Sequence, residues 1–396
     1  MSHPDTLIAS WARSPVMPHG GAFRDLQAHE IAAPVVRALL ERVVVQPGQA
    51  RPLQIDALVC GNALGAGGNP ARMIALAAGL PDACAAFSVD TQCCSGLDAI
   101  AFAAGLLASG QARVVIAGGV EAWSRAPIRQ VRPLRPGGVA VPYERPAFAP
   151  DPARDPDLLE AAARFAHLRG YTREQQDTYA LQSHQRAVTH RALVAPELVR
   201  IPTDASPAGM VDAYPRALSV QRVARMPVAA REPSGGIGDF SVSTLGVSTR
   251  ADGAAFVLLA TGQACSEFGI VAQARWLASA SVGCAPEMPL LAAERAALEV
   301  MRRLSVVSAR ELHAVELHDA FAAQGLGFCE ALGLDPAWIN RCGGGIARGH
   351  PIGASGAIAL VRVLADLQRD GPTLARGLAV VAGAGGIGAA TMVARA

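Results

Sequence analysis

The stretch Cys93-Cys94-Ser95-Gly96 opens an apolar run, Leu97 to Leu107, and Arg113-Val114-Val115-Ile116-Ala117-Gly118-Gly119 follows that run. The same order returns near the C-terminus. There Ala354-Ser355-Gly356 opens the apolar run Ala357 to Leu367, and Leu378-Ala379-Val380-Val381-Ala382-Gly383 follows. A longer apolar run predicts a buried helix, and a short β-branched run that ends in glycine predicts a buried strand. The repeated order therefore indicates two copies of one helix–strand unit.

These units also predict the fold class. Short continuous apolar runs between helices favour a sheet that is covered by helices on both faces. We therefore expect an α/β protein with a duplicated α/β/α core. The expected organisation is an N-terminal core half at 1–122 that is completed by 241–265, an insertion at 123–240, and a C-terminal core half at 266–396.

The expected insertion differs in composition from the two halves. Seven prolines lie between Pro133 and Pro156, with arginines and few strand signals, and a polar helical stretch follows near Arg173. This composition predicts a loop-rich segment that is laid over the core. Two roles remain open for it, a surface or dimer arm and a lid that covers the substrate.

The composition limits the classes of function. Hydrophobic residues make up 51% of the 396 residues and charged residues only 17%, which favours a well-buried α/β protein. The net charge of +2 provides no electrostatic basis for binding nucleic acid or a membrane. No apolar run approaches the roughly 18 residues of a membrane span, and Met1 to Pro15 lacks the apolar centre of a secretory signal. We therefore expect a cytoplasmic protein.

The basic residues and the cysteines narrow the chemistry further. The chain contains no lysine, so all 35 basic residues are arginines and a Schiff-base lysine is excluded. Any phosphate must then be held by arginine, backbone N–H groups or hydroxyls. The eight cysteines form no C-x-x-C pair, which predicts reduced thiols and no metal site.

Cys93 and His350 are the strongest candidates for catalysis. Each lies in a turn of small residues that opens an apolar helix. The positive end of a helix lowers the pKa of a thiol, and a nearby imidazole can take its proton. Together the two residues predict a cysteine nucleophile with a histidine base, and hence a covalent acyl-transfer enzyme.

Other polar and aromatic residues are weaker candidates. His318 follows the strand-like run Ala314 to Leu317, and strand ends are where α/β proteins usually bind ligands. His184 and its neighbours lie in a polar helical run and are expected to be solvated. Trp123 and Trp276 are expected to be packing residues.

Five segments together resemble the thiolase family, and the similarity runs nearly from end to end. The segments are Asp90 to Gly96, similar to N-x-x-C-x-S-G; Gly118 to Pro127, similar to G-G-x-E-x-M-S-x-x-P; Asp212 to Arg216, similar to D-E-Y-x-R; Ser248 to Ala255, similar to A-S-x-x-N-D-G-A-A; and Gly343 to Gly356, which matches G-G-x-x-x-x-G-H-P-x-G-x-S-G.

The resemblance implies roles for individual residues. Cys93 takes the place of the acyl-accepting nucleophile, with the His350 imidazole as its base. Backbone N–H groups of Cys93 and Ala384 form an oxyanion hole. Arg216 corresponds to the arginine that contacts the phosphates of coenzyme A. Further coenzyme A contacts are implied for Ser248, Ala320 and Phe321.

Three departures from the family pattern affect the second half of the reaction. The family's C-x-G-G-x-G motif aligns on Ala382 to Gly388, so its reactive cysteine is replaced by Ala382. The N-E-A-F motif is His318-Asp319-Ala320-Phe321 here, with an imidazole in place of an amide. The H-M-G-x-T-A-E segment is not recognisable, and Asp157 to Ala163 stands near its place.

These departures leave alternatives open. Acylation of Cys93 is retained, but alanine cannot act as the base that deprotonates acetyl-CoA. Either another group such as Cys342 replaces the missing cysteine, or the carbanion forms by decarboxylation, which needs no base. In the second case Cys93, His318 and His350 resemble the Cys-His-His triad of the β-ketoacyl synthases, where the imidazoles stabilise the enolate.

The resemblance therefore implies an acyltransferase that uses a coenzyme A thioester as substrate and has no tightly bound cofactor. It makes or cleaves carbon–carbon bonds, in the manner of acetyl-CoA acetyltransferases and 3-ketoacyl-CoA thiolases. The alternatives are a decarboxylating condensing enzyme or other acyl transferase, and a catalytically reduced thiolase-like partner protein. The family resemblance also implies a homodimer or homotetramer.

Overall fold

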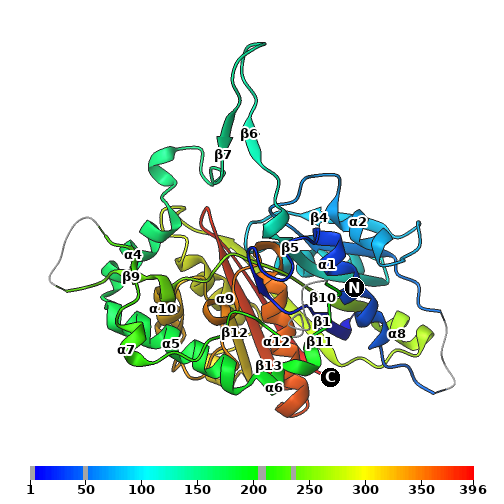
Figure 1. Ribbon diagram of the computed structural model, residues 1–396. Helices are drawn as coiled ribbons and strands as arrows, with labels where there is room; N and C mark the ends of the chain where they lie inside the picture. The colour runs from blue at the N-terminus through cyan, green and yellow to red at the C-terminus, as the bar shows by residue number, and fades with distance from the viewer. Residues whose placement is uncertain (1–4, 48–51, 204–210, 233–237) are drawn as a thin grey trace.

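The computed structural model describes residues 5–47, 52–203, 211–232 and 238–396 (Figure 1). Its strands are β1 (Thr6–Arg13), β2 (Met17–Pro18), β3 (Ala57–Gly61), β4 (Ala85–Val89), β5 (Val114–Ala122), β6 (Arg129–Val131), β7 (Val141–Tyr143), β8 (Val228–Ala230), β9 (Val242–Ser243), β10 (Ala251–Thr261), β11 (Ala274–Gly283), β12 (Ala314–His318), β13 (Arg376–Gly383) and β14 (Ile387–Arg395).

Twelve helices are assigned in the same ranges. They are α1 (Ala28–Glu41), α2 (Pro70–Ala77), α3 (Ser95–Ala108), α4 (Leu158–Arg169), α5 (Arg173–Thr189), α6 (Arg191–Val194), α7 (Val220–Val223), α8 (Gly262–Phe268), α9 (Leu291–Arg303), α10 (Ala322–Leu332), α11 (Gly345–Arg348) and α12 (Ser355–Asp370).

The sheet has the duplicated order that the sequence predicts. Its strands run β4-β3-β5-β10-β1 in one half and β11-β14-β13-β12 in the other, and β1 pairs with β11. In the first half, β3 pairs with β5 in parallel, and β5 with β10 and β10 with β1 are antiparallel. In the second half, β12 pairs with β13 in parallel, and β13 with β14 and β14 with β11 are antiparallel. The strand order β3-β5-β10-β1 in one half thus corresponds to β12-β13-β14-β11 in the other.

Helices α3 and α12 form the layer between the two halves. They contact each other and strands of both halves, and their apolar side chains share one hydrophobic cluster with both sets of strands. Helices α1, α2 and α8 pack on the outside of the first half, and α9 and α10 pack on the outside of the second. The α/β fold class and its duplicated core are confirmed.

Small residues allow the first turns of α3 and α12 to approach closely. A Cβ on Gly96 would lie 2.6 Å from the backbone oxygen of Gly353, and a Cβ on Gly356 would lie 2.8 Å from Cβ of Leu97. Neither distance is tolerated, so both positions require glycine. The turns that precede the two helices, which carry Cys93 and His350, are thereby held together.

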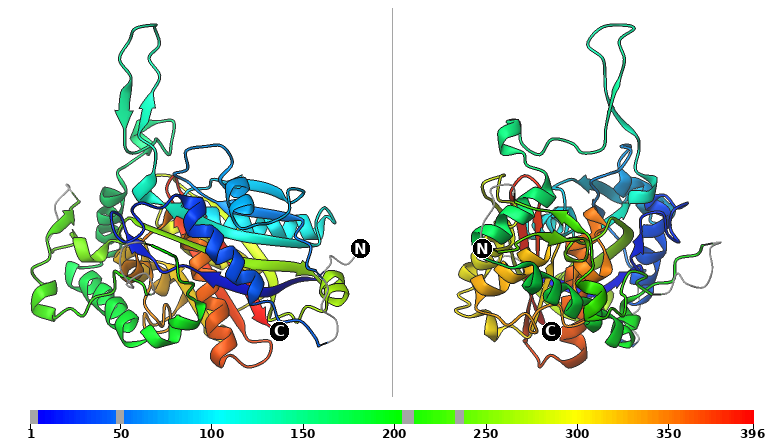
Figure 2. Two further views of the ribbon diagram at one scale, coloured as in Figure 1. Left: turned by 45° about the vertical axis from the view of Figure 1, so that its right-hand side comes forward. Right: turned by 60° about the vertical axis from the view of Figure 1, so that its left-hand side comes forward.

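The segment between β5 and β10 is more helical than its composition indicates. Its helices α4 and α5 pack against α10 through two small hydrophobic clusters. Two strands, β6 and β7, form a hairpin that projects from the body of the molecule in every view (Figures 1 and 2). The domain boundaries drawn at 122/123, 240/241 and 265/266 stay predictions, and 204–210 and 233–237 lie outside the described residues.

Candidate active site

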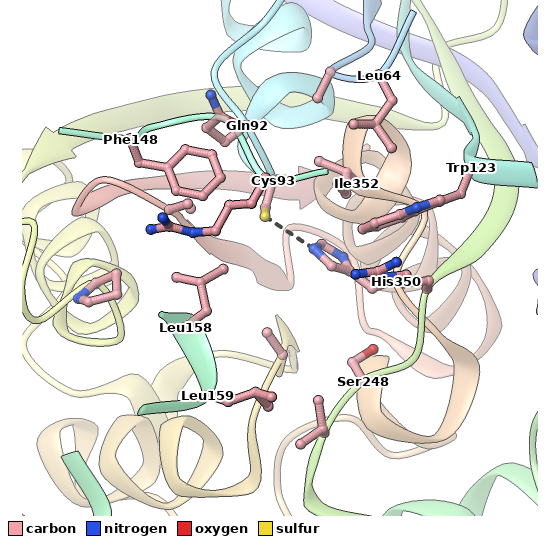
Figure 3. A pocket seen from close by; sticks show the side chains of 18 of the residues that line it. Leu64, Gln92, Cys93, Trp123, Phe148, Leu158, Leu159, Ser248, His350 and Ile352 are labelled. Atoms are coloured by element: carbon pink, nitrogen blue, oxygen red, sulfur yellow. Dashed lines mark hydrogen bonds between the residues drawn. The ribbon is translucent and has the colours of Figure 1, made fainter. Parts of the chain in front are cut away.

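Cys93 lies in a turn immediately before α3. Gln92 has a φ of 56°, in the left-handed region that residues other than glycine seldom adopt. The Ser95 hydroxyl supports this conformation, since it accepts a hydrogen bond from the Thr91 N–H at 2.9 Å and donates to the Gln92 carbonyl at 2.5 Å. Cys93 lines a cavity (Figure 3), and its side chain also packs against the hydrophobic cluster to which α3 belongs.

His350 contacts the thiol directly. Its Nε2 lies 3.1 Å from Sγ of Cys93, and its Nδ1 lies 2.7 Å from Oγ of Ser355 (Figure 3). The Ser355 hydroxyl has a single proton, which it donates to the Pro351 carbonyl at 2.9 Å. Oγ must therefore accept from Nδ1–H, so the neutral imidazole has its lone pair on Nε2, facing the thiol. This is the tautomer that a general base at Cys93 requires.

The charge state of this pair differs from the sequence-based expectation. Burial raises the pKa of the Cys93 thiol to about 12, although backbone N–H groups of Ala384 and Cys93 act against the shift. Burial also lowers the pKa of His350 to about 4. Desolvation is the largest cause, so the pKa of Cys93 is raised and not lowered as we expected from the helix start. At neutral pH the pair is a thiol beside a neutral imidazole.

His318 lies against His350. The two rings are stacked with centroids 4.3 Å apart and an interplanar angle of 26°. Burial, together with the neighbouring His350 and Arg348, holds the pKa of His318 well below its usual range. Among the described residues its Nε2 has no hydrogen-bond partner. His318 is thus a neutral imidazole in contact with the proposed base.

The cavity has a volume of about 920 Å³. Six of the predicted site residues line it, namely Cys93, Ser248, Ala320, Phe321, His350 and Ala384. Ala382, where the family pattern has a cysteine, lines it too. The backbone N–H groups of Cys93 and Ala384 lie within hydrogen-bond reach of the thiol. Their role as an oxyanion hole stays a prediction.

Two predicted residues are not on this wall. His318 lies behind His350, and the Arg216 guanidinium lies over the Tyr214 ring, 4.7 Å from its centroid. Next to Tyr214, His184 is fully buried rather than solvated, and its Nδ1 accepts a hydrogen bond from the Arg216 backbone N–H. The polar pattern of this helix could not predict the burial of His184, because its hydrogen-bond partner Arg216 lies in a loop that is distant in the sequence. The role of Arg216 in phosphate binding stays a prediction.

The structure also gives roles to residues that the sequence analysis did not single out as site residues, although Glu121 lies in the quoted segment Gly118 to Pro127. Glu121 is buried and accepts hydrogen bonds from backbone N–H groups of Ala63, Leu64 and Gly353, so it ties the turn after His350 to β5. Burial raises the pKa of Glu121 to about 7. Trp123 lines the cavity instead of the core, whereas Trp276 packs against the core as expected.

Cys342 does not replace the missing cysteine. It is buried beside a small cavity that Ala187, Arg191 and Asp212 line, apart from the cavity of Cys93. Within the described ranges no cluster of histidine, cysteine or acidic residues could hold a metal ion. No helix in those ranges is long and apolar enough to cross a membrane.

A half-buried cysteine–histidine contact beside a large cavity in a duplicated α/β fold is an arrangement that suits enzymes that pass an acyl group through a cysteine thioester. Residues 6–263 match the family model "Thiolase, N-terminal domain", and residues 270–395 match "Thiolase, C-terminal domain". The chain belongs to the thiolase family.

Individual relatives cover the whole chain. An acetyl-CoA acetyltransferase of Rhizobium meliloti is 34% identical over 411 residues, with 100% of both chains covered. Among solved structures, an acetyl-CoA acetyltransferase of Bacillus anthracis has a TM-score of 0.88 at 29% identity, covering 100% of this chain and 99% of its own. The Acat5 thiolase of Ascaris suum, solved with coenzyme A, has a TM-score of 0.85 at 27% identity, covering 99% and 100%.

Proposed function

We propose that the protein transfers acyl groups from coenzyme A thioesters through an acyl thioester on Cys93. The observation that carries this proposal is the 3.1 Å contact between the Cys93 thiol and the unprotonated nitrogen of His350, in a cavity of about 920 Å³. The names of the relatives, acetyl-CoA acetyltransferases, and the coenzyme A bound to the Ascaris suum thiolase support it.

The first half-reaction follows from this geometry. His350 Nε2 takes the thiol proton as Sγ of Cys93 attacks the thioester carbon. The carbonyl oxygen becomes negative and is stabilised by the backbone N–H groups of Cys93 and Ala384. The carbon–sulfur bond to coenzyme A then breaks, and His350 returns its proton to the departing thiolate. The products are free coenzyme A and acyl-Cys93.

The second half-reaction lacks the cysteine that the family pattern provides. Ala382 occupies that position on the cavity wall and carries no acid or base. In the ordinary thiolase reaction a second acyl-CoA must lose a proton from its α-carbon in the synthetic direction. In the cleavage direction, the acyl-CoA enolate that leaves when the carbon–carbon bond of the 3-ketoacyl-CoA breaks must gain one. A water molecule or another group then has to move that proton.

A second candidate function rests on the stacked imidazoles. Decarboxylation of a malonyl-type thioester generates the α-carbanion without a base. The pKa values of both His318 and His350 are lowered, so neither is charged at neutral pH. His350 can donate an N–H to an enolate oxygen once Cys93 is acylated and the imidazole proton moves from Nδ1 to Nε2. The 4.3 Å stacking of the two rings favours this alternative.

Intact-mass measurements after mixing with acetyl-, malonyl- and longer acyl-CoA test the proposal. We expect a mass increase equal to the acyl group in the wild-type protein and none in Cys93→Ala. Acylation that persists in Cys93→Ala, or modification of Cys94 instead, contradicts the assignment. Release of CO₂ from malonyl-CoA separates the decarboxylating candidate from the ordinary thiolase.

We further propose a cytoplasmic homodimer or homotetramer. The support is the family resemblance and the exposed apolar side chains on and beside the β6–β7 hairpin, such as Ile128 at 88% and Val139 at 87% exposure. Light scattering at micromolar concentration is expected to give at least twice the 40.8 kDa of one chain. A mass of one chain contradicts the proposal.

A further inference from the structure

Arg250 lies beside the catalytic histidine. A parallel β-bridge pairs Arg250 with His350, and the His350 N–H donates to the Thr249 carbonyl at 2.6 Å. Residues that pair directly across neighbouring strands have side chains on the same face, with Cβ atoms about 5 Å apart. Both side chains line the cavity. The guanidinium of Arg250 is therefore positioned near the reacting end of a bound thioester.

Trp123 supports this guanidinium. Arg250 Cζ lies 5.0 Å from the centroid of the Trp123 ring, at a distance where a cation and an aromatic face attract. Figure 3 shows Trp123 and Phe148 on opposite sides of the Cys93–His350 pair. Because Trp123 is large and comes from the end of β5, it limits where the Arg250 side chain can go.

The guanidinium N–H groups of Arg250 donate no hydrogen bond to another residue of the described ranges. Across the described ranges its guanidinium makes no hydrogen bond or ion pair. The two other arginines that line the cavity do: Arg145 pairs with Asp155, and Arg129 donates to the Ala63 carbonyl at 3.0 Å. A guanidinium presents five N–H donors in a plane that matches a carboxylate.

Acidic residues of the cavity do not neutralise Arg250. Three acidic residues line the wall, Asp90, Glu144 and Asp157. Asp90 accepts from the Gln92 N–H, and Asp157 accepts from the first N–H groups of α4. None of the three forms an ion pair with Arg250. The cavity therefore presents an uncompensated positive charge next to its base.

We propose that Arg250 binds a carboxylate on the acyl group, so that the substrate is the coenzyme A thioester of a dicarboxylic acid or of its 3-keto derivative. This inference rests on the proposed acyl transfer through Cys93. The phosphates of coenzyme A are a second possible anion, but the pantetheine arm separates them from the thioester. The backbone of Arg250 pairs with that of His350 and its side chain lines the same cavity, so its guanidinium is placed to meet the acyl part of the substrate instead.

The test compares two thioesters with acyl groups of five carbons, glutaryl-CoA with a terminal carboxylate and pentanoyl-CoA without one. The rate of Cys93 acylation is measured by intact mass for wild type and Arg250→Leu. Hydrogen bonds to charged groups are typically worth 1.5–3 kcal/mol, so we expect the preference for glutaryl over pentanoyl to fall by about 10- to 100-fold. Arg250→Lys, which keeps the charge but not the planar donors, should restore part of that preference.

Control variants separate the outcomes. Arg132→Leu removes a charge from the exposed β6–β7 hairpin and should leave the preference unchanged. An equal loss of acylation with both thioesters in Arg250→Leu would assign Arg250 to coenzyme A, and an unchanged preference would exclude a role in recognising the substrate. Either result overturns the proposal.

A binding measurement separates this proposal from the proposed function. If no thioester acylates Cys93, the acyl-transfer proposal fails. Calorimetry with the Cys93→Ala variant still tests Arg250, because it compares the affinity for glutaryl-CoA and pentanoyl-CoA without chemistry. A higher affinity for glutaryl-CoA that Arg250→Leu abolishes supports the inference, and equal affinities for the two thioesters contradict it.

Discussion

Replacing His350 with asparagine is expected to slow acylation of Cys93 by about 10²- to 10⁴-fold, the usual range for a positioned general base. The reason is the charge state of the pair. Burial raises the pKa of the thiol to about 12, so nearly all of it is protonated at pH 7. Attack on a thioester therefore depends on proton transfer to His350 during the reaction, and asparagine cannot accept that proton.

The acylation rate of the wild-type enzyme should also depend little on pH across the neutral range. His350 accepts a proton only while its ring is neutral, and its pKa is lowered to about 4. We therefore expect the rate to fall only as pH drops toward 4, rather than near the usual 6.5 of histidine. Single-turnover kinetics with acetyl-CoA from pH 4 to 9 measure this. A midpoint near 6.5 would mean that the imidazole is solvated.

Ser355→Ala is the matched control for His350→Asn, because it tests the tautomer of His350 without removing the imidazole. It removes the acceptor that places the His350 proton on Nδ1, 2.7 Å away, but leaves the imidazole in place. The expected loss is smaller than for His350→Asn, and iodoacetamide labelling of Cys93 should slow in both. Acylation at the wild-type rate in His350→Asn would contradict the assignment of His350 as the base.

The duplication and the pairing of Cys93 with His350 were predictable from the sequence, and the reason is local. Apolar runs of helix and strand length return in the same order, and both reactive residues precede a small-residue helix start. Gly96 and Gly356 are required where α3 and α12 meet, so the same small residues that mark the turns also bring them together. The local sequence pattern at each helix start therefore also indicates that α3 and α12, which are far apart in the sequence, contact each other.

The contacts that set the orientation and the pKa values of the site residues were not predictable from local sequence patterns. The stacking of His318 on His350 and the support of Arg250 by Trp123 join residues that are far apart in the chain. The desolvation that raises the pKa of Cys93 depends on the whole cavity and opposes the helix effect expected from the turn alone. A sequence pattern identifies which residue types are present, but not which of them remain without a partner once the chain has folded.

Replacing Ala382 with cysteine is expected to raise acetyl-CoA self-condensation or acetoacetyl-CoA thiolysis by up to about 10²- to 10⁴-fold. Ala382 lines the same cavity as Cys93 and His350, so a thiol at this position adds an acid or base where the α-carbon reacts. Ala382→Ser is the matched control, because a hydroxyl fills similar space but is a poor proton carrier. Assays of free coenzyme A measure both directions, because self-condensation releases it and thiolysis consumes it.

The native enzyme distinguishes the two mechanisms for the second half-reaction. If His318 and His350 stabilise an enolate formed by decarboxylation, malonyl-CoA should be consumed much faster than acetyl-CoA as the nucleophilic partner. His318→Asn should then impair that turnover but leave acylation of Cys93 intact, because the 3.1 Å contact between Sγ of Cys93 and Nε2 of His350 does not involve His318. Efficient cleavage of 3-ketoacyl-CoA by the wild-type enzyme, without any malonyl activity, would contradict decarboxylation. It would mean that water or another group moves the proton in place of the missing cysteine.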